Sequence, residues 1–351
     1  MFETVKEIYK SLIAARKPYD FFGDVNTKEE LKKLFHNITK RIHPDSIHNK
    51  EDYYMSCEAS PILNKLYMEA KKEMDEGIYG VIDPVKIYEK MSPLFSLKVK
   101  GKEYQFYENL FDGEVSDIYR GICDGMLSYL KLASDKEDNG LLAQEFDILS
   151  KFPHQLLPYA EAKIKVNDRQ AIIMHEVQGV PMEDIMSKYP AGIPAEHVMW
   201  MLERLLNVAG WLHSNKIIHG NIKPENIIID PATHRVTLLG LSFAIKDANT
   251  KEARYKIVND FYTAPEVNKD AHVMPGSDIY SIGKVAIKML GGNVSNKGMP
   301  VNVDVRIRDF IRNMCDDDTG KRPNDAWELW SSLISLRTEI YGKRRFQSLE
   351  I

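Results

Sequence analysis

Cysteine is scarce in this sequence, whose 351 residues contain only Cys57, Cys123 and Cys315. The three lie far apart and form neither a C-x-x-C pair nor an even-numbered set, which excludes a disulfide framework and favours free thiols in a reducing compartment. Long apolar runs are also missing, since none approaches the roughly 18 residues that span a bilayer. The charged, amphipathic start of the chain lacks the apolar segment of a signal peptide. We therefore expect a cytoplasmic protein that does not enter a membrane.

Surplus positive charge is missing as well. The 47 Lys and Arg residues are outnumbered by 51 Asp and Glu residues, which gives a formal net charge of -4. No global basic field is available to hold nucleic acid, so we expect no nucleic-acid partner. The hydrophobic content of 44% is ordinary for a globular protein, and the length allows about two domains.

The N-terminal part is predicted to be helical. Residues 27–42 have the pattern of an amphipathic helix that starts with a capping box, Thr27 with Glu30, and ends before Pro44. Its apolar stripe consists of Leu31, Leu34, Phe35, Ile38 and Ile42, and its basic residues off that stripe are Lys32, Lys33, Lys40 and Arg41. A second helix is predicted from Ser60-Pro61 to about Gly77, and a further one over residues 2–16.

Two short motifs accompany these helices. Residues 19–23 read Y-D-F-F-G, and His43-Pro44-Asp45 follows the basic helix directly. In this setting the segment resembles the J domain of the DnaJ co-chaperone family. The resemblance implies that a DnaK-type chaperone is bound through His43, Pro44, Asp45, Lys32, Lys33, Lys40 and Arg41, and that its ATPase is stimulated. The alternatives from the residues alone are that the tripeptide simply forms a turn and that the basic face is a solvated helix surface.

The rest of the chain turns from strand-like to helical sequence. Strands are predicted at 96–99 and 104–110, and a long helix at 194–213. The stretch 212–226 is similar to the catalytic loop of the protein-kinase family, whose pattern is H-R-D-L-K-P-E-N. We expect a multidomain protein, in which an all-α J domain (a helical hairpin) is followed by an α+β two-lobed protein-kinase-like fold. The predicted parts are 1–80, the J domain with an extra N-terminal helix; 81–100, a connector; 101–342, the kinase-like domain, β-rich to about 176 and helical from about 177; and 343–351, a tail.

The kinase resemblance assigns residues to a nucleotide. Only Gly113 persists from the glycine-rich loop, and close approach of backbone to phosphate needs positions without a Cβ. Lys131 keeps the ammonium that pairs with phosphates, and Glu145 is its partner on the next helix. Tyr129 replaces a small residue that packs on adenine. The implied nucleotide-binding set is Gly113, Tyr129, Lys131, Glu145, Met174, Lys223 and Asn226.

Two carboxylates of the family pattern are missing. Asn221 stands where the catalytic loop has its Asp, and an amide cannot accept a hydroxyl proton as a carboxylate does. By spacing, Gly240-Leu241-Ser242 replaces the metal-binding D-F-G. Glycine offers Mg²⁺ no oxygen ligand from a side chain. We therefore expect little catalysis and no metal site.

The residues that hold the family framework are kept. Glu266 of an A-P-E motif has a predicted partner in Arg322, and Asp278 is expected to brace the catalytic-loop backbone beside His219. Architecture is therefore predicted to be intact although the chemistry is impaired.

The functional expectation follows from both resemblances. We expect a J-domain co-chaperone that stimulates a DnaK-type ATPase, with a pseudokinase domain that binds a client or scaffold protein. This role requires no cofactor, and weak ATP binding, with or without magnesium, is left open. The alternatives are a divergent active serine/threonine protein kinase targeted by a J domain, and a nucleotide sensor without catalysis.

Overall fold

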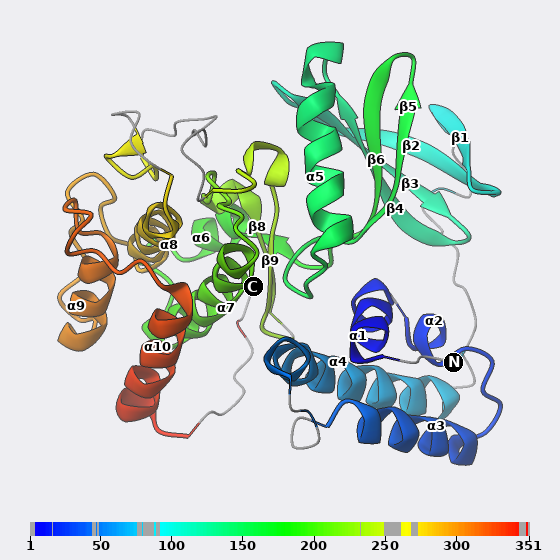
Figure 1. The fold of residues 1–351 in the computed structure, drawn as a ribbon, viewed down its shortest axis with the longest axis horizontal. Helices are drawn as coiled ribbons and strands as arrows, with labels where there is room; N and C mark the ends of the chain where they lie inside the picture. The colour runs from blue at the N-terminus through cyan, green and yellow to red at the C-terminus, as the bar shows by residue number, and fades with distance from the viewer. Residues whose placement is uncertain are drawn as a thin grey trace. The chain divides into compact units, whose positions relative to one another are not determined.

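The computed structural model (Figure 1) describes residues 4–15, 17–43, 47, 49–75, 79, 88, 92–231, 233–248, 261–267, 273–343 and 349. The chain divides into two compact units. Unit 1 contains residues 1–140, 153–155 and 159–176, and unit 2 contains residues 141–152, 156–158 and 177–351.

Unit 1 begins with four helices. They are α1 (Val5–Ala14), α2 (Pro18–Phe22), α3 (Lys28–Arg41) and α4 (Lys50–Asp75). The predicted helices at 2–16 and 27–42 are confirmed by α1 and α3. Thr27 caps α3 by accepting a hydrogen bond from the backbone N–H of Glu30, but the Glu30 carboxylate accepts from Asn26 instead of returning to Thr27.

The predicted start of the next helix at Ser60-Pro61 is wrong, because α4 begins ten residues earlier, at Lys50, and contains Pro61 in its interior. A proline inside a helix removes one hydrogen bond and normally destabilises it by about 3 kcal/mol. Here an apolar stripe runs past the proline on both sides, and burial of that stripe offsets the loss. The buried residues are Met55, Ala59, Leu63, Leu66 and Ala70.

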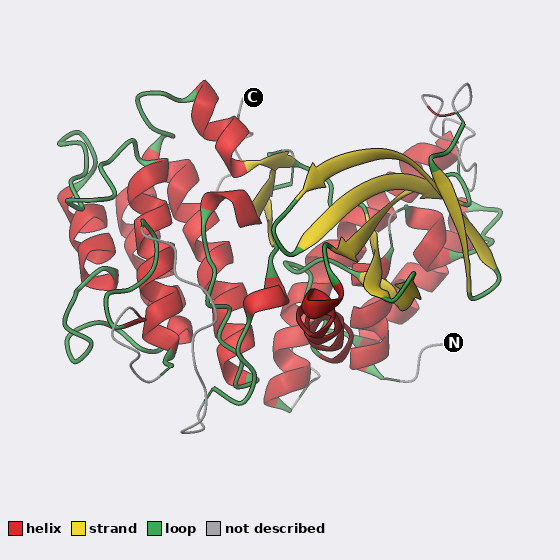
Figure 2. Cartoon of the chain, turned by 90° about the horizontal axis from the view of Figure 1, so that it is seen from above, coloured by secondary structure: helices red, strands yellow, loops and turns green. Residues whose placement is uncertain are grey.

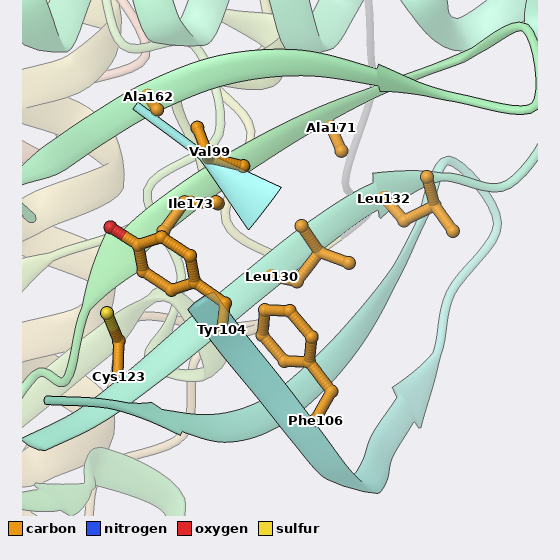
Figure 3. Packing of buried hydrophobic residues seen from close by; sticks show 9 residues of the cluster. All are labelled: Val99, Tyr104, Phe106, Cys123, Leu130, Leu132, Ala162, Ala171 and Ile173. Atoms are coloured by element: carbon orange, nitrogen blue, oxygen red, sulfur yellow. The ribbon is translucent and has the colours of Figure 1, made fainter. Parts of the chain in front are cut away.

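A six-stranded antiparallel sheet completes unit 1. Its order is β1-β2-β3-β4-β6-β5. The strands are β1 (Phe95–Val99), β2 (Lys102–Asp112), β3 (Ser116–Cys123), β4 (Met126–Ala133), β5 (Ala160–Val166) and β6 (Arg169–His175). The predicted strands at 96–99 and 104–110 are confirmed by β1 and β2. One face carries a buried cluster to which all six strands contribute, and Figure 3 shows its side chains pointing toward one another: Val99, Tyr104, Phe106, Cys123, Leu130, Leu132, Ala162, Ala171 and Ile173.

Unit 2 is mainly helical, as the red ribbons of Figure 2 show. Its α-helices are α5 (Asn139–Lys151), which starts at the unit boundary, α6 (Met182–Lys188), α7 (Ala195–Ser214), α8 (Pro275–Met289), α9 (Val305–Met314) and α10 (Ala326–Tyr341). A small antiparallel sheet joins β7 (Val180–Pro181), β8 (Ile227–Asp230) and β9 (Arg235–Leu238). The 3-10 helices whose bounds lie within the described residues include η3 (Lys136–Asp138, in unit 1), η4 (Pro224–Asn226) and η5 (Leu241–Phe243).

Helix α7 confirms the helix predicted at 194–213 and is apolar almost all round. From Val198 to Leu212 only Arg204 is not buried. A helix that is buried on every side belongs to the core of its unit. None of the helices in the described ranges combines the length and apolarity needed to cross a bilayer.

Candidate functional site

In unit 1, Gly113 lies in the turn between β2 and β3. Its N–H donates to the carbonyl of Ser116 (3.2 Å), and its carbonyl accepts from the Ser134 hydroxyl (2.7 Å). A Cβ at this position would lie 2.6 Å from the Ser116 oxygen. The glycine is therefore required for a tight turn, and its N–H is already bonded within the protein instead of being directed at a ligand.

Lys131 and Tyr129 lie on β4 and alternate with Leu130 and Leu132 of the buried cluster. Side chains along a strand point to opposite faces in turn, so Lys131 and Tyr129 share the other face. The strand register places Tyr129 opposite Met174 on β6. Three members of the predicted nucleotide set thus come from neighbouring strands of one sheet.

Tyr129 is held in place on that face. Its hydroxyl donates to the Glu176 carboxylate at 3.4 Å, and the Arg120 guanidinium lies 3.7 Å from the same carboxylate. Burial, together with the negative charge of Glu176, raises the pKa of Tyr129 to about 12. A neutral phenol fixed on this face of β4 narrows the space that a small residue would leave open.

In unit 2, the loop that carries Asn221 is braced by Asp278 on α8. The Asp278 carboxylate accepts the backbone N–H groups of His219 (2.8 Å) and Gly220 (2.9 Å), and His213 Nε2 lies 2.9 Å from it. Burial alone would raise the pKa of Asp278, but these donors lower it below its ordinary value. The predicted brace is confirmed, and His213 is a member that the sequence did not reveal.

Hydrogen bonds made by Asn226 also fix the loop backbone at Asn221. Asn226, at the end of η4, donates from Nδ2 to the Asn221 carbonyl at 2.8 Å, and the Asn226 carbonyl accepts from the N–H of Leu239. Lys223 precedes η4 as its N-terminal flanking residue. Within the described part of the chain, the buried Oδ1 of Asn221 has no hydrogen-bond partner. A buried amide oxygen therefore stands where the family has a carboxylate.

Gly240 occupies the predicted metal position and packs against the side-chain amide of Asn226. Its φ is +85°, and a Cβ there would lie 2.8 Å from Oδ1 of Asn226. The residues at the two family metal positions therefore supply one amide oxygen and no carboxylate. Magnesium demands near-octahedral oxygen coordination and is usually held by one or two carboxylates. This donor set does not fit the magnesium arrangement of kinases, and the described residues contain no cluster of three or more His, Cys, Asp or Glu that suits a metal.

Ser242, two residues later, makes a buried contact that the sequence analysis did not predict. Its hydroxyl donates to the Glu145 carboxylate on α5 at 2.5 Å, and Gln144 donates to the Ala244 carbonyl at 2.6 Å. Glu145 and Ser242 are both 2% exposed. The segment in the D-F-G position thus holds α5 inside unit 2. The predicted pair of Lys131 with Glu145 joins residues of different units and stays a prediction.

The framework ion pair of unit 2 is confirmed. Arg322 Nη2 lies 2.6 Å from Glu266 Oε1, and the Ser277 hydroxyl donates to the same oxygen at 2.7 Å. Both charged side chains are buried. Each neutralises the charge of the other, which offsets the free-energy cost of removing them from water. His219 is also buried, which lowers its pKa, and its Nε2 lies 2.8 Å from the Leu239 carbonyl.

The residues predicted to bind a chaperone are separate from these groups. Lys32, Lys33, Lys40 and Arg41 lie on α3 and are exposed, as is His43 directly after it. Pro44 and Asp45 lie outside the described residues.

Comparison with known proteins gives a match to the protein kinase domain over residues 104–335. The serine/threonine-protein kinase dkf-2 of Caenorhabditis briggsae is 26% identical over 222 residues, which are 60% of this chain and 18% of that protein. The serine/threonine-protein kinase RUNKEL of Arabidopsis thaliana is 23% identical over 66% of this chain and 17% of its own length. The probable serine/threonine-protein kinase PknB of Lactococcus lactis is 20% identical over 57% of this chain and 33% of its own length. The chain thus matches well under half the length of each of these relatives.

These matches overturn the main functional expectation. A J-domain co-chaperone with a non-catalytic pseudokinase is not what they support, because no J-domain family matches and the relatives are named serine/threonine kinases. Two sequence features led to the wrong expectation, the tripeptide at 43–45 and the basic face of the helix predicted at 27–42. The same tripeptide can occur in an ordinary turn, and a basic face is common on solvated helices. The predicted DnaK-type partner depended on that resemblance and is untested. The kinase match covers more than half of the 351 residues, and the chain therefore belongs to the protein kinase family.

Proposed function

We propose that this chain is a divergent serine/threonine protein kinase, which transfers the γ-phosphoryl group of ATP to a hydroxyl of a protein substrate. The observation that carries the proposal is the braced loop at 219–226 with its unpartnered Asn221 Oδ1. Buried polar atoms are normally hydrogen-bonded, so an acceptor without a partner in the described chain suggests a donor that arrives with a ligand. A substrate hydroxyl is a donor of this kind.

The proposed role of Asn221 is to orient that hydroxyl. An amide oxygen accepts a hydrogen bond but cannot take the proton, so general-base catalysis is lost. Phosphoryl transfer passes through a loose transition state, in which positioning and charge stabilisation matter more than proton removal. We therefore expect slow transfer, with the hydroxyl proton leaving to phosphate or solvent.

Positive charge from the chain would meet the phosphates. Lys131 on β4 and Lys223 beside η4 retain the cations that the family uses for this purpose. Because the donor set at Asn226 and Gly240 does not fit magnesium in the family manner, no step is assigned to a metal. The lower charge neutralisation is a second reason to expect a slow reaction.

The decisive experiment measures the transfer of radiolabelled phosphate from ATP to a general protein substrate that offers both serine and threonine hydroxyls. We expect measurable transfer by the full chain and its loss in Lys131→Ala. Lys165→Ala is the matched control, because Lys165 is an exposed lysine on β5 of the same sheet. Equal counts from wild type and Lys131→Ala would contradict the proposal.

A second candidate is ATP binding without transfer. The contact between Gly240 and the Asn226 amide favours it, because this contact fills the place of the missing carboxylate. In that case ATP should raise the melting temperature in a concentration-dependent way, since a ligand at 100 times its Kd stabilises the folded state by about 2.7 kcal/mol. A melting shift that Lys131→Ala removes, together with no phosphate transfer, would select this candidate.

A further inference from the structure

Three polar side chains of unit 1 lie together at one end of the six-stranded sheet. The strand register pairs Asp117 with Leu132, and Leu132 with Ala171. Because Leu132 and Ala171 belong to the buried cluster, Asp117 lies on the same face of the sheet. Ser134 comes two residues after Leu132, and Arg169 comes two residues before Ala171. Side chains alternate along a strand, so Ser134 and Arg169 lie on that face as well.

Ser134 holds the turn between β2 and β3 by two hydrogen bonds. Its hydroxyl donates to the Gly113 carbonyl at 2.7 Å, and its backbone N–H donates to the Val115 carbonyl at 3.1 Å. The turn is also closed on itself by the bond from Gly113 N–H to the Ser116 carbonyl. One side chain outside the turn therefore fixes the position of its only glycine.

An ion pair supports this side chain. Arg169 Nη1 lies 3.4 Å from Asp117 Oδ2 and donates to the Ser134 carbonyl at 3.3 Å. The Ser134 hydroxyl lies 3.4 Å from Asp117 Oδ1, but its single proton is used in the shorter bond to Gly113. The side chains of Asp117 and Arg169 are 16% and 34% exposed, so water screens their attraction. We call this set, Gly113, Asp117, Ser134 and Arg169, the turn latch.

The turn latch acts from the face of the sheet opposite to Lys131. The register pairs Lys131 with Ile118, whose side chain alternates with that of Asp117. A turn that contacts phosphates beside Lys131 has to bend toward the Lys131 face. Bending in that direction lengthens the bond between Ser134 and Gly113, which comes from the other face. The bonds of the turn latch therefore oppose closure of the turn over a ligand.

We propose that the turn latch is an autoinhibitory contact, which holds the turn at 113–115 away from a bound triphosphate and opens when the triphosphate is taken up. The choice of ATP as the ligand rests on the proposed function. Ser134, Asp117 and Arg169 are positioning residues, and they touch no reacting group. Affinity for a ligand is reduced by the fraction of protein in the competent state, here the open turn. The turn latch thereby raises the ATP concentration that half-saturates the protein.

The test compares hydrogen–deuterium exchange and ATP binding in the full chain. Ser134→Ala removes the donor to Gly113, and it should speed exchange of the Gly113 and Ser134 amides about fivefold, the factor for one hydrogen bond. The Kd for ATP, measured by the shift in melting temperature, should fall by about the same factor. Ser134→Thr keeps the hydroxyl and should match wild type in both measurements. Ser96→Ala is the matched control, because Ser96 is an exposed serine on β1 of the same sheet.

Arg169→Gln serves as a second variant if Ser134→Ala does not fold. It breaks the ion pair with Asp117 and leaves the sequence of the turn unchanged, so the same changes should appear at about twofold.

The direction of the change in ATP affinity decides the proposal. Faster exchange in the turn together with tighter ATP binding supports it, because mere loosening of the structure would not tighten binding. Faster exchange with unchanged or weaker binding overturns it, and so does unchanged exchange. Absence of ATP binding in both wild type and Ser134→Ala overturns it as well. Neither measurement needs catalysis, so wild-type protein that binds ATP without transferring phosphate would end the proposed function alone.

Discussion

The loop at 219–226 and the segment at 240–242 have each lost a carboxylate of the kinase pattern, but the structure around the two losses differs. At Asn221 the backbone is still braced by Asp278, and the side chain differs from aspartate by one atom type. At Gly240 the neighbouring Asn226 amide has occupied the vacated volume, and Ser242 has a new bond to Glu145. The first loss changes the chemistry of a side chain on a loop whose backbone is held by Asp278, whereas the second changes the packing. Four substitutions test this comparison, from the largest expected change in stability to the smallest.

Asp278→Ala should remove the brace and cause the largest effect. Breaking a buried, hydrogen-bonded charge destabilises by about 3–5 kcal/mol, because two N–H groups and His213 lose their acceptor. Urea unfolding measures the loss, and phosphate transfer should vanish with it. Asp309→Ala, which removes an exposed carboxylate on α9, should change stability by less than about 0.5 kcal/mol.

The difference in unfolding free energy between wild type and Asp278→Ala should depend on pH in a defined direction. The folded-state pKa of Asp278 is lowered, so its stabilising contribution is present above the unfolded-state pKa of about 4 and is lost as pH falls through the folded value. The gap in stability between wild type and Asp278→Ala should therefore shrink below about pH 4. A gap that widened in acid would show that the carboxylate is not stabilised by its donors.

Gly240→Asp should destabilise the protein instead of restoring a metal site. The new Cβ would displace the Asn226 amide from its bond to the Asn221 carbonyl, and overpacking of this kind costs roughly 1–3 kcal/mol. Thermal unfolding with and without magnesium checks this. A gain in stability that appears only with magnesium would contradict the comparison. It would mean that an aspartate at position 240 restores a metal site despite the contact between Gly240 and Asn226.

Ser242→Ala should weaken the attachment of α5. The lost bond is made to a carboxylate, and such bonds contribute about 1.5–3 kcal/mol when buried, less any relaxation of Glu145. We expect about 1.5 kcal/mol in urea unfolding and faster hydrogen exchange in α5. Ser187→Ala is the control, since that hydroxyl bonds only its own helix at an exposed position among the contacts described. Equal effects of the two would remove Ser242 from the comparison.

Asn221→Asp should change stability least, by about 1 kcal/mol, because the side chains are nearly isosteric and the cost comes only from a new charge at a buried position. Its effect on transfer should be large, since a positioned base contributes about 100-fold or more. We expect at least a tenfold rise in labelled phosphate transfer. No rise at all in a folded Asn221→Asp protein would show that the braced loop is not the limiting element of the reaction.

Much of the fold was predictable from local pattern. The helices at 5–14, 28–41 and 195–214 and the first two strands follow from periodicity and caps. The start of α4 was not predictable, because Pro61 marks a helix start by local rules and only burial of the stripe on both sides of it overrides them. Tyr88 was assigned to a connector, yet it is 2% exposed and its ring stacks on Tyr107. Such contacts between distant residues leave no local signal.

The site divides in the same way. The positions of Asn221, Glu266, Asp278 and Arg322 follow from motif spacing, and the contacts of the framework residues agree with it. The role of Ser242 was hidden, because spacing marks its position in the motif without revealing its partner on α5.

By itself the sequence determined that a kinase framework is present and that its two acidic positions carry an amide and a glycine, because these are matters of residue identity and spacing along the chain. Only the tertiary structure decided that Asn226 packs against Gly240, that Ser242 holds Glu145, and that Ser134 bonds to Gly113. Each of these joins residues distant in sequence, and their partners are selected by packing and by the need of buried polar groups for hydrogen bonds, which act only once the chain is folded.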